Sequence, residues 1–121
     1  MIPVERLYNI ALRTAQASVG VRKVRICAVG SYRNSIYIGL NSWLTHPKQA
    51  RFARNPHSIY LHAEIACLIR AKWRIDQLVI VRVSRDNKPV LAKPCAGCRQ
   101  AIPAQCQIFY TTDLGVTCDV Y

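Results

Sequence analysis

The sequence predicts a single α/β domain in which helices cover a mixed β-sheet, because helical and strand patterns alternate in the order α-β-β-α-β-α-β. The length of 121 residues suits one domain, so we expect residues 1–121 to fold as one unit. Hydrophobic residues make up 51% of the chain and charged residues only 19%, which provides for a core and argues against disorder.

The N-terminal half contains three predicted elements and one long loop. Apolar residues at helical spacing predict a helix over 4–15. Residues 22–29 and 35–40 indicate two strands, and the short polar segment between them predicts an antiparallel hairpin. Residues 41–58 contain prolines and basic side chains, and they predict a long loop with one helical turn.

The C-terminal half contains two predicted helices and three predicted strands. Apolar residues at helical spacing predict a helix over 61–69, and the apolar run at 78–83 predicts a buried strand. A short helix is expected over 95–102. Residues 107–111 indicate another strand, and 116–121 suit a short last strand.

The chain is strongly basic, with 17 Lys and Arg against 6 Asp and Glu and a formal net charge of +11. Such a field favours phosphate-bearing partners, namely nucleotides, nucleic acids or anionic membranes. No apolar run approaches the roughly 18–20 residues that span a bilayer. Charged residues interrupt the N-terminal segment, so we expect no signal peptide, no membrane association and a cytoplasmic location.

In that reducing compartment the six cysteines are expected to be ligands, nucleophiles or core residues, with a disulfide framework as the alternative. Cys27 and Cys67 lie within predicted elements, and we expect them to be core residues. Cys106 and Cys118 flank the final hairpin, where we also expect packing. Whether this last pair meets across the hairpin or binds a second metal is left open.

Two short motifs carry the candidate chemistry: His62-Ala63-Glu64 and Pro94-Cys95-Ala96-Gly97-Cys98. A Cys-x-x-Cys pair lets two thiolates reach one ion from a single helical turn, and a helix N-terminus favours the thiolate form. With His62 as third ligand, one tetrahedral position stays open for water, which is typical of catalytic zinc. Glu64 is then placed to take and deliver a proton.

Two other hypotheses explain part of this pattern. A redox pair would use Cys95 and Cys98 but would leave His62 and Glu64 without a role. A structural zinc would need a fourth ligand. The candidates for that ligand are His46, His57, Cys27, Cys67, Cys106 and Cys118.

The combined H-x-E…P-C-x-x-C pattern resembles the cytidine deaminase superfamily, and the resemblance covers nearly the whole chain. The segment Pro94–Gln100 looks like the P-C-G-x-C-R-Q form of free cytidine deaminases, with the glycine displaced by one place. The segment Ile38–Asn41 looks like the family's G-x-N. Trp43 stands where free cytidine deaminases commonly carry a glutamate.

The resemblance implies a three-layer α/β/α fold with a five-stranded mixed sheet and a short antiparallel last strand. It implies zinc-dependent hydrolytic deamination at C4 of cytosine, with zinc held by His62, Cys95 and Cys98. Glu64 would move the proton to N3 and to the leaving ammonia. Asn41 would bind the sugar, and backbone groups at Ala63 would read the base edge. It also implies a homo-oligomer.

The first substrate hypothesis is a free cytosine nucleotide or nucleoside, of the dCMP or cytidine type. The loop after Asn41 supplies basic side chains just before the active-site helix, and one or two of them are expected to hold a 5′-phosphate. These candidates are His46, Lys48, Arg51 and Arg54. This loop favours dCMP over the nucleoside.

The alternative substrate is a cytosine in single-stranded DNA or RNA, which the net charge of +11 favours. The residues that would extend a phosphate track are Arg22, Lys23, Arg25, Arg33, Arg70, Lys72 and Arg74. The aromatic residues that would stack on bases are Tyr32, Tyr37, Trp43 and Phe52. A third reading, a zinc-stabilised binding module without turnover, would leave Glu64 without a purpose.

Overall fold

The structure is a computed structural model, and it describes residues 2–18, 25–42, 45–52, 60–113 and 115–119. Helices and strands alternate along the chain much as the sequence predicts. The helices are α1 (Val4–Ala17), α2 (Pro47–Arg51), α3 (Ala63–Ala71) and α4 (Ala96–Ala101). The strands are β1 (Arg25–Tyr32), β2 (Ser35–Leu40), β3 (Gln77–Val83), β4 (Pro89–Val90), β5 (Gln107–Thr112) and β6 (Gly115–Asp119).

The strands form one mixed sheet in the order β2-β1-β3-β5-β6. β1 is antiparallel to both β2 and β3, β3 is parallel to β5, and β6 returns antiparallel to β5. This confirms the five-stranded mixed sheet and its antiparallel last strand. Residues 89–90 add the two-residue strand β4 against the end of β3.

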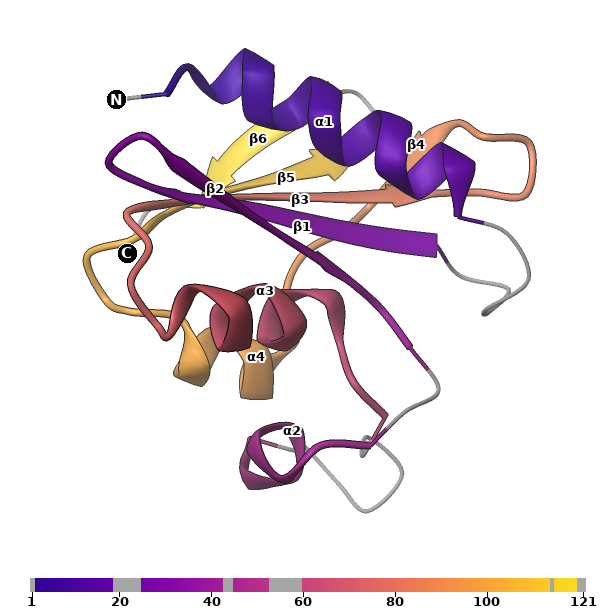
Figure 1. Cartoon of the computed structure of the whole chain (residues 1–121). Coiled ribbons are helices and arrows are strands. Elements are labelled where there is room, and N and C mark those ends of the chain that lie inside the picture. The colour runs from indigo at the N-terminus through magenta and orange to yellow at the C-terminus, as the bar shows by residue number, and fades with distance from the viewer. Residues whose placement is uncertain (1, 19–24, 43–44, 53–59, 114, 120–121) are drawn as a thin grey trace.

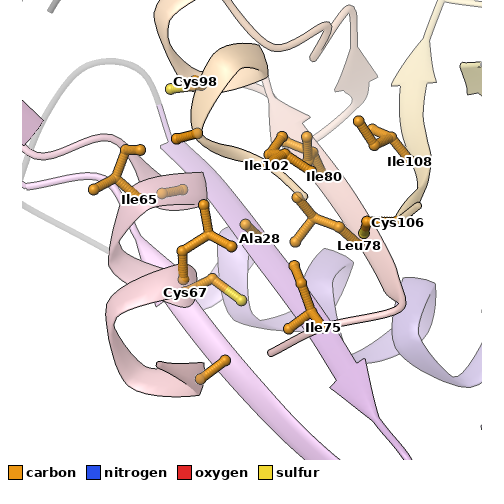
Figure 2. Close-up of a cluster of buried hydrophobic side chains, with 14 of the residues drawn as sticks. Ala28, Ile65, Cys67, Ile75, Leu78, Ile80, Cys98, Ile102, Cys106 and Ile108 are labelled. Carbon is orange, nitrogen blue, oxygen red and sulfur yellow. The ribbon is translucent and has the colours of Figure 1, made fainter. Parts of the chain in front are cut away.

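The sheet is the middle of three layers, with α1 on one face and α3 and α4 on the other, while α2 lies beyond α3 (Figure 1). β3 contributes side chains to both faces of the sheet, because successive side chains of a strand point to opposite sides. Leu78 and Ile80 pack on the side of α3 and α4, whereas Val79 and Val81 pack against α1. Figure 2 shows the first of these clusters, with Cys98 of α4 at its margin.

Local backbone features explain where β1 ends and where α2 begins. β1 continues to Tyr32 rather than ending at Val29, because the chain turns only at Arg33, which has a φ of 57°. The expected helical turn in the 41–58 loop is α2, which begins with Pro47 in the first turn, where a missing N–H costs nothing. None of the described helices is both long and apolar enough to span a membrane.

Gly39 of β2 sets the distance between the sheet and α3. A Cβ atom at this position would lie 2.3 Å from the Ala63 carbonyl oxygen and 2.4 Å from the Cys67 nitrogen. Only a residue without a side chain lets a strand and a helix backbone approach so closely. Gly39 therefore fixes where α3 begins relative to the sheet.

Candidate metal centre and active-site cavity

The N-termini of α3 and α4 bring the two sequence motifs together. His62 is the N-cap residue of α3, and Cys95 is the N-cap residue of α4, where its sulfur accepts the Cys98 N–H. The Trp73 indole N–H donates to the Ala101 carbonyl at 3.0 Å, which ties the end of α3 to the end of α4. The two helices thus hold their N-terminal residues on the same side of the sheet.

The three predicted metal ligands converge. His62 Nδ1 lies 3.1 Å from Cys98 Sγ and 3.7 Å from Cys95 Sγ, and the three donor atoms lie within 4.8 Å of one another. Zinc bonds of about 2.0–2.1 Å to nitrogen and about 2.3 Å to sulfur, at tetrahedral angles, separate such donors by about 3.6 Å. One nitrogen and two sulfur donors at these separations fit a zinc ion with an open position.

The pKa values of the two thiols are shifted in opposite directions. The Cys98 thiol and the His62 side chain form hydrogen bonds to Cys95, and they lower the pKa of the Cys95 thiol to about 3. The pKa of the Cys98 thiol is raised, first by that hydrogen bond to Cys95 and then by burial. A bound metal ion would deprotonate both thiols, because the thiolate is the form that ligates.

Glu64 lies two residues into the same helix, and its side chain is 5% exposed. Burial raises the pKa of this carboxyl, and the nearby His62 opposes the shift. Glu64 lines one cavity together with His62 and Cys95. This placement agrees with the sequence prediction that Glu64 stands beside the three candidate ligands and is not itself one of them.

This cavity has a volume of about 260 Å³, slightly below the common range of small-ligand pockets. Its lining residues are Ile26, Asn41, His62, Glu64, Arg82, Lys93 and Cys95. Asn41 is held in place by β1, because its Oδ1 accepts the Ile26 N–H at 3.0 Å and its own N–H donates to the Ile26 carbonyl at 3.3 Å. Ala63 is fully buried at the first turn of α3.

The cations predicted to hold phosphate lie elsewhere. His46 caps α2 through Nδ1, which accepts the Lys48 N–H, and it lines a different cavity beside Ile69 and Arg70. The Lys48 ammonium lies 5.5 Å from the centre of the Trp73 ring, and Arg51 stacks over Phe52. Arg54, the fourth candidate, lies outside the described residues. Three of the four candidates therefore do not line the cavity that contains His62 and Glu64.

Three residues of the site were missed by the sequence analysis. Arg82 and Lys93 line the cavity, and Gln49 of α2, which is 1% exposed, accepts the His62 N–H through Oε1 at 2.9 Å. A sequence signal existed for Arg82, since an arginine interrupts an otherwise apolar strand. Lys93 stands two residues before Cys95. Nothing in the sequence singles out Gln49.

Several residues proposed for a nucleic-acid track make contacts within the described structure. The Arg25 guanidinium donates to the carbonyl oxygens of Gln16 and Ser84 at 3.1 and 2.6 Å. Arg33 stacks over Tyr32. Tyr37 and Phe52 pack against the core cluster of α3 and α4. The remaining candidates in 22–23 and at 43 lie outside the described residues.

The other described cysteines are core residues. Cys27, Cys67 and Cys106 are buried, and each thiol is free. Burial raises the pKa of each to about 12. Cys118 stands opposite Phe109 in the β5–β6 pairing, and its side chain, like His57, lies outside the description. Within the part of the chain that is described, no fourth His, Cys, Asp or Glu joins the metal-ligand group.

The class of protein follows from combining this site with the sheet order: an α/β domain with a His-Cys-Cys metal group at two helix N-termini. No family model and no curated protein matches the sequence. Solved structures do match the fold. Cytidine deaminase from Burkholderia pseudomallei superposes with a TM-score of 0.70 at 13% identity, over 98% of this chain and 92% of that chain.

Cytidine deaminases from two mycobacteria also superpose on this chain, with lower TM-scores. The Mycobacterium leprae structure has a TM-score of 0.56 at 17% identity, over 98% of this chain and 94% of that chain. The Mycobacterium tuberculosis structure has a TM-score of 0.55 at 15% identity, over 98% and 91%. The chain therefore has the cytidine deaminase-like fold, over nearly its whole length and nearly the whole length of these structures.

Proposed function

We propose that this protein is a zinc-dependent hydrolase that deaminates a free cytosine nucleotide or nucleoside, of the dCMP or cytidine type. The products are the uracil compound and ammonia. The observation that carries the proposal is the convergence of His62, Cys95 and Cys98 beside buried Glu64 in one cavity. The likeness of the fold to cytidine deaminases supports the same chemistry.

Each residue of the cavity has a distinct task in this reaction. His62 Nδ1, Cys95 Sγ and Cys98 Sγ would hold zinc, which supplies a water activated for attack on C4. Glu64 would take one proton from that water and deliver it to N3 of the ring, then take the second proton from the hydroxyl formed at C4 and pass it to the amine, which leaves as ammonia when the C4–N bond breaks. Asn41 is proposed to bind the sugar, and the backbone at Ala63 to read the base edge.

The proposal includes a cytoplasmic location and assembly into a homo-oligomer. The free thiols support a reducing compartment, because the described cysteines Cys27, Cys67, Cys95, Cys98 and Cys106 form no disulfide. Assembly rests on the resemblance alone.

A single-stranded nucleic acid is the second candidate substrate, and the net charge of +11 favours it. Among the described residues, the charge is little offset by local pairing, since the one ion pair there is Lys88 with Asp86 at 3.7 Å. A strand would use several of these cations, so its binding would weaken steeply with salt.

The test measures ammonia release by zinc-loaded protein at low and moderate salt. The panel is cytidine, deoxycytidine, CMP, dCMP, dCTP and a cytosine-containing single strand. Turnover of monomers supports the first substrate class, and turnover of the strand alone supports the second. No release from any compound contradicts the proposed activity.

A matched pair of variants tests the proton shuttle. Glu64→Gln should retain bound zinc and lose activity by about 10²- to 10⁴-fold, the usual contribution of general acid–base catalysis. Glu5→Gln makes the same change on the exposed surface of α1 and should leave turnover intact. Activity that survives Glu64→Gln would show that the proton is moved by another group.

A further inference from the structure

We propose that Arg82 and Lys93 form an anion subsite that holds a phosphate of the substrate, so that the enzyme prefers a cytosine nucleotide to the nucleoside. This inference rests on the proposed function, because it assigns the substrate class of that same cavity. It assigns phosphate binding to Arg82 of β3 and Lys93 of the segment before α4, and no longer to the cations of the 46–51 segment.

Arg82 stands in a core register position. In β3 it follows Leu78 and Ile80 on the face of the sheet that carries α3 and α4, and it pairs with Ile26 on β1 and Val90 on β4. Ile26 and Arg82 both line the cavity. A half-buried guanidinium has lost part of its hydration, so it needs an anionic or polar partner.

The described part of the chain supplies no such partner to Arg82. Among the described residues, no carboxylate lies within 4.0 Å of the Arg82 or Lys93 side chain, and no hydrogen bond from either is found. The backbone around Arg82 is nevertheless fixed, because its N–H donates to Thr111 Oγ1, whose hydroxyl donates to the Val90 carbonyl at 2.6 Å. These bonds hold the backbone of Arg82 in place, and no described residue offsets the charge of its side chain, as in a site prepared for a ligand.

Lys93 reaches the same cavity from the segment that leads into α4. Its neighbour Ala92 is anchored to β5, since the Ala92 N–H donates to the Thr111 carbonyl at 2.9 Å. Lys93 itself is exposed, whereas Glu64 at the metal group is buried. The cavity therefore has its carboxylate on the buried side, and a cation at its exposed rim.

The charges that line the cavity favour an anion. Two cations, Arg82 and Lys93, line the cavity together with the Glu64 carboxylate and the Cys95 thiolate, and a bound zinc ion would offset the charge of the two thiolates that hold it. A cytosine ring placed at Glu64 and the metal group leaves the sugar and its 5′ substituent for the remaining lining residues. A guanidinium and an ammonium are the donors that recognise phosphate, the first with a fork and the second as a point charge.

The phosphate has two possible sources, a free nucleotide or the backbone of a strand. Arg82 also lines a neighbouring cavity of about 440 Å³, together with Arg85 and Asp113. A strand would continue from Arg82 toward Arg85, whereas a mononucleotide would stop at Arg82. We favour the mononucleotide, because Asp113 lies on the path beyond it.

The experiment compares Arg82→Gln and Lys93→Gln with Arg74→Gln and Lys48→Gln, each of which removes one positive charge. The readout is the ratio of kcat/KM for dCMP to that for deoxycytidine. We expect the first two variants to lower this ratio at least about tenfold each, as the loss of a charged hydrogen bond does. Arg74→Gln and Lys48→Gln should leave the ratio unchanged, since Arg74 is exposed and Lys48 lies at Trp73.

Binding of the products provides a second readout that does not depend on turnover. Calorimetry should show dUMP binding more tightly than deoxyuridine, with the difference reduced in both cavity variants. Thermal unfolding checks that Arg82→Gln folds, and the exposed Lys93→Gln variant provides the test if it does not. An unchanged dCMP-to-deoxycytidine ratio with unchanged dUMP binding would overturn the subsite, while cytosine turnover in that case would leave the proposed function intact.

A third measurement distinguishes the two phosphate sources. Arg85→Gln should leave dCMP turnover unchanged and lower turnover of a cytosine-containing strand only if that strand is the substrate. A ratio lowered by Lys48→Gln instead of by the cavity variants would return the phosphate to the loop and contradict the assignment.

Discussion

Gly39→Ala is expected to disturb both stability and the candidate metal centre. The added Cβ would meet the Ala63 oxygen at 2.3 Å, the Cys67 nitrogen at 2.4 Å and the Ala66 carbonyl carbon at 3.0 Å. All three are backbone atoms of α3, so no change of rotamer relieves the overlap. Ordinary contacts with a Cβ begin near 3.4 Å, and α3 must therefore move from β2 by about 1 Å.

The cost follows from the size of that movement. Overpacking a well-packed core costs about 1–3 kcal/mol, and a contact with backbone belongs at the upper end of that range. At an unfolding entropy of about 2.1 cal/mol/K per residue, a loss of about 3 kcal/mol lowers the Tm of a domain of this size by about 12 °C. Because His62 and Glu64 open the helix that moves, activity should fall by about 100-fold, the usual effect of a 1 Å misplacement.

The assay is thermal unfolding of the zinc-loaded protein, followed by measurement of bound zinc and of turnover at a temperature where the variant is folded. Gly30→Ala is the matched control. Its Cβ would lie 3.0 Å from side-chain atoms of Cys67 and Ile75, which need to shift by only a few tenths of an ångström, and in ordinary contact with the Gln77 carbonyl oxygen at 3.5 Å. A Tm for Gly39→Ala no lower than that of Gly30→Ala would refute the argument.

Two further predictions concern the surroundings of the site. Gln49→Ala removes the acceptor of the His62 backbone N–H and leaves that donor without its partner at the start of α3, a cost of about 1–3 kcal/mol, so bound zinc should be weakened about 10- to 100-fold, and a metal titration measures the loss. An unchanged affinity would mean that α2 does not orient His62. The buried thiols Cys27, Cys67 and Cys106 have folded pKa values of about 12, above those of the unfolded chain. The contribution of these protonated thiols to the free energy of unfolding is therefore fully present below about pH 8.5. It is lost as the pH rises toward 12, because the unfolded chain releases its thiol protons first, and the loss is on the order of 1 kcal/mol per thiol and pH unit. Denaturant unfolding from pH 8 to 11 measures this fall, and a stability that stays flat would contradict the burial of these thiols.

Much of the candidate site could be predicted from sequence because its members are local. Cys95 and Cys98 are one helical turn apart, and His62 and Glu64 are two residues apart. Each short motif therefore identifies its two residues and also fixes how they lie relative to each other. The strand and helix patterns were similarly local, which explains why β2 was predicted with its observed bounds. Boundaries failed where a single backbone conformation decided them, as at Arg33.

The tertiary structure decided which cations face the cavity. The segment that contains His46, Lys48 and Arg51 precedes α3 in sequence, yet these side chains contact other partners in and around α2. Arg82 reaches the cavity through strand register, and Lys93 through the path from β4 to α4.

The sequence by itself determined the class of the sheet, the order of its helices and strands, and the donor set of His62, Cys95 and Cys98 beside Glu64. Periodicity and short motifs are properties of neighbouring residues, and they persist whatever the rest of the chain does. The tertiary structure alone decided the surroundings of that donor set: Gln49 behind His62, and Arg82 at the cavity wall. Those contacts join segments 13 or more residues apart, and only the packing of β1, β3, α2 and α3 brings them together.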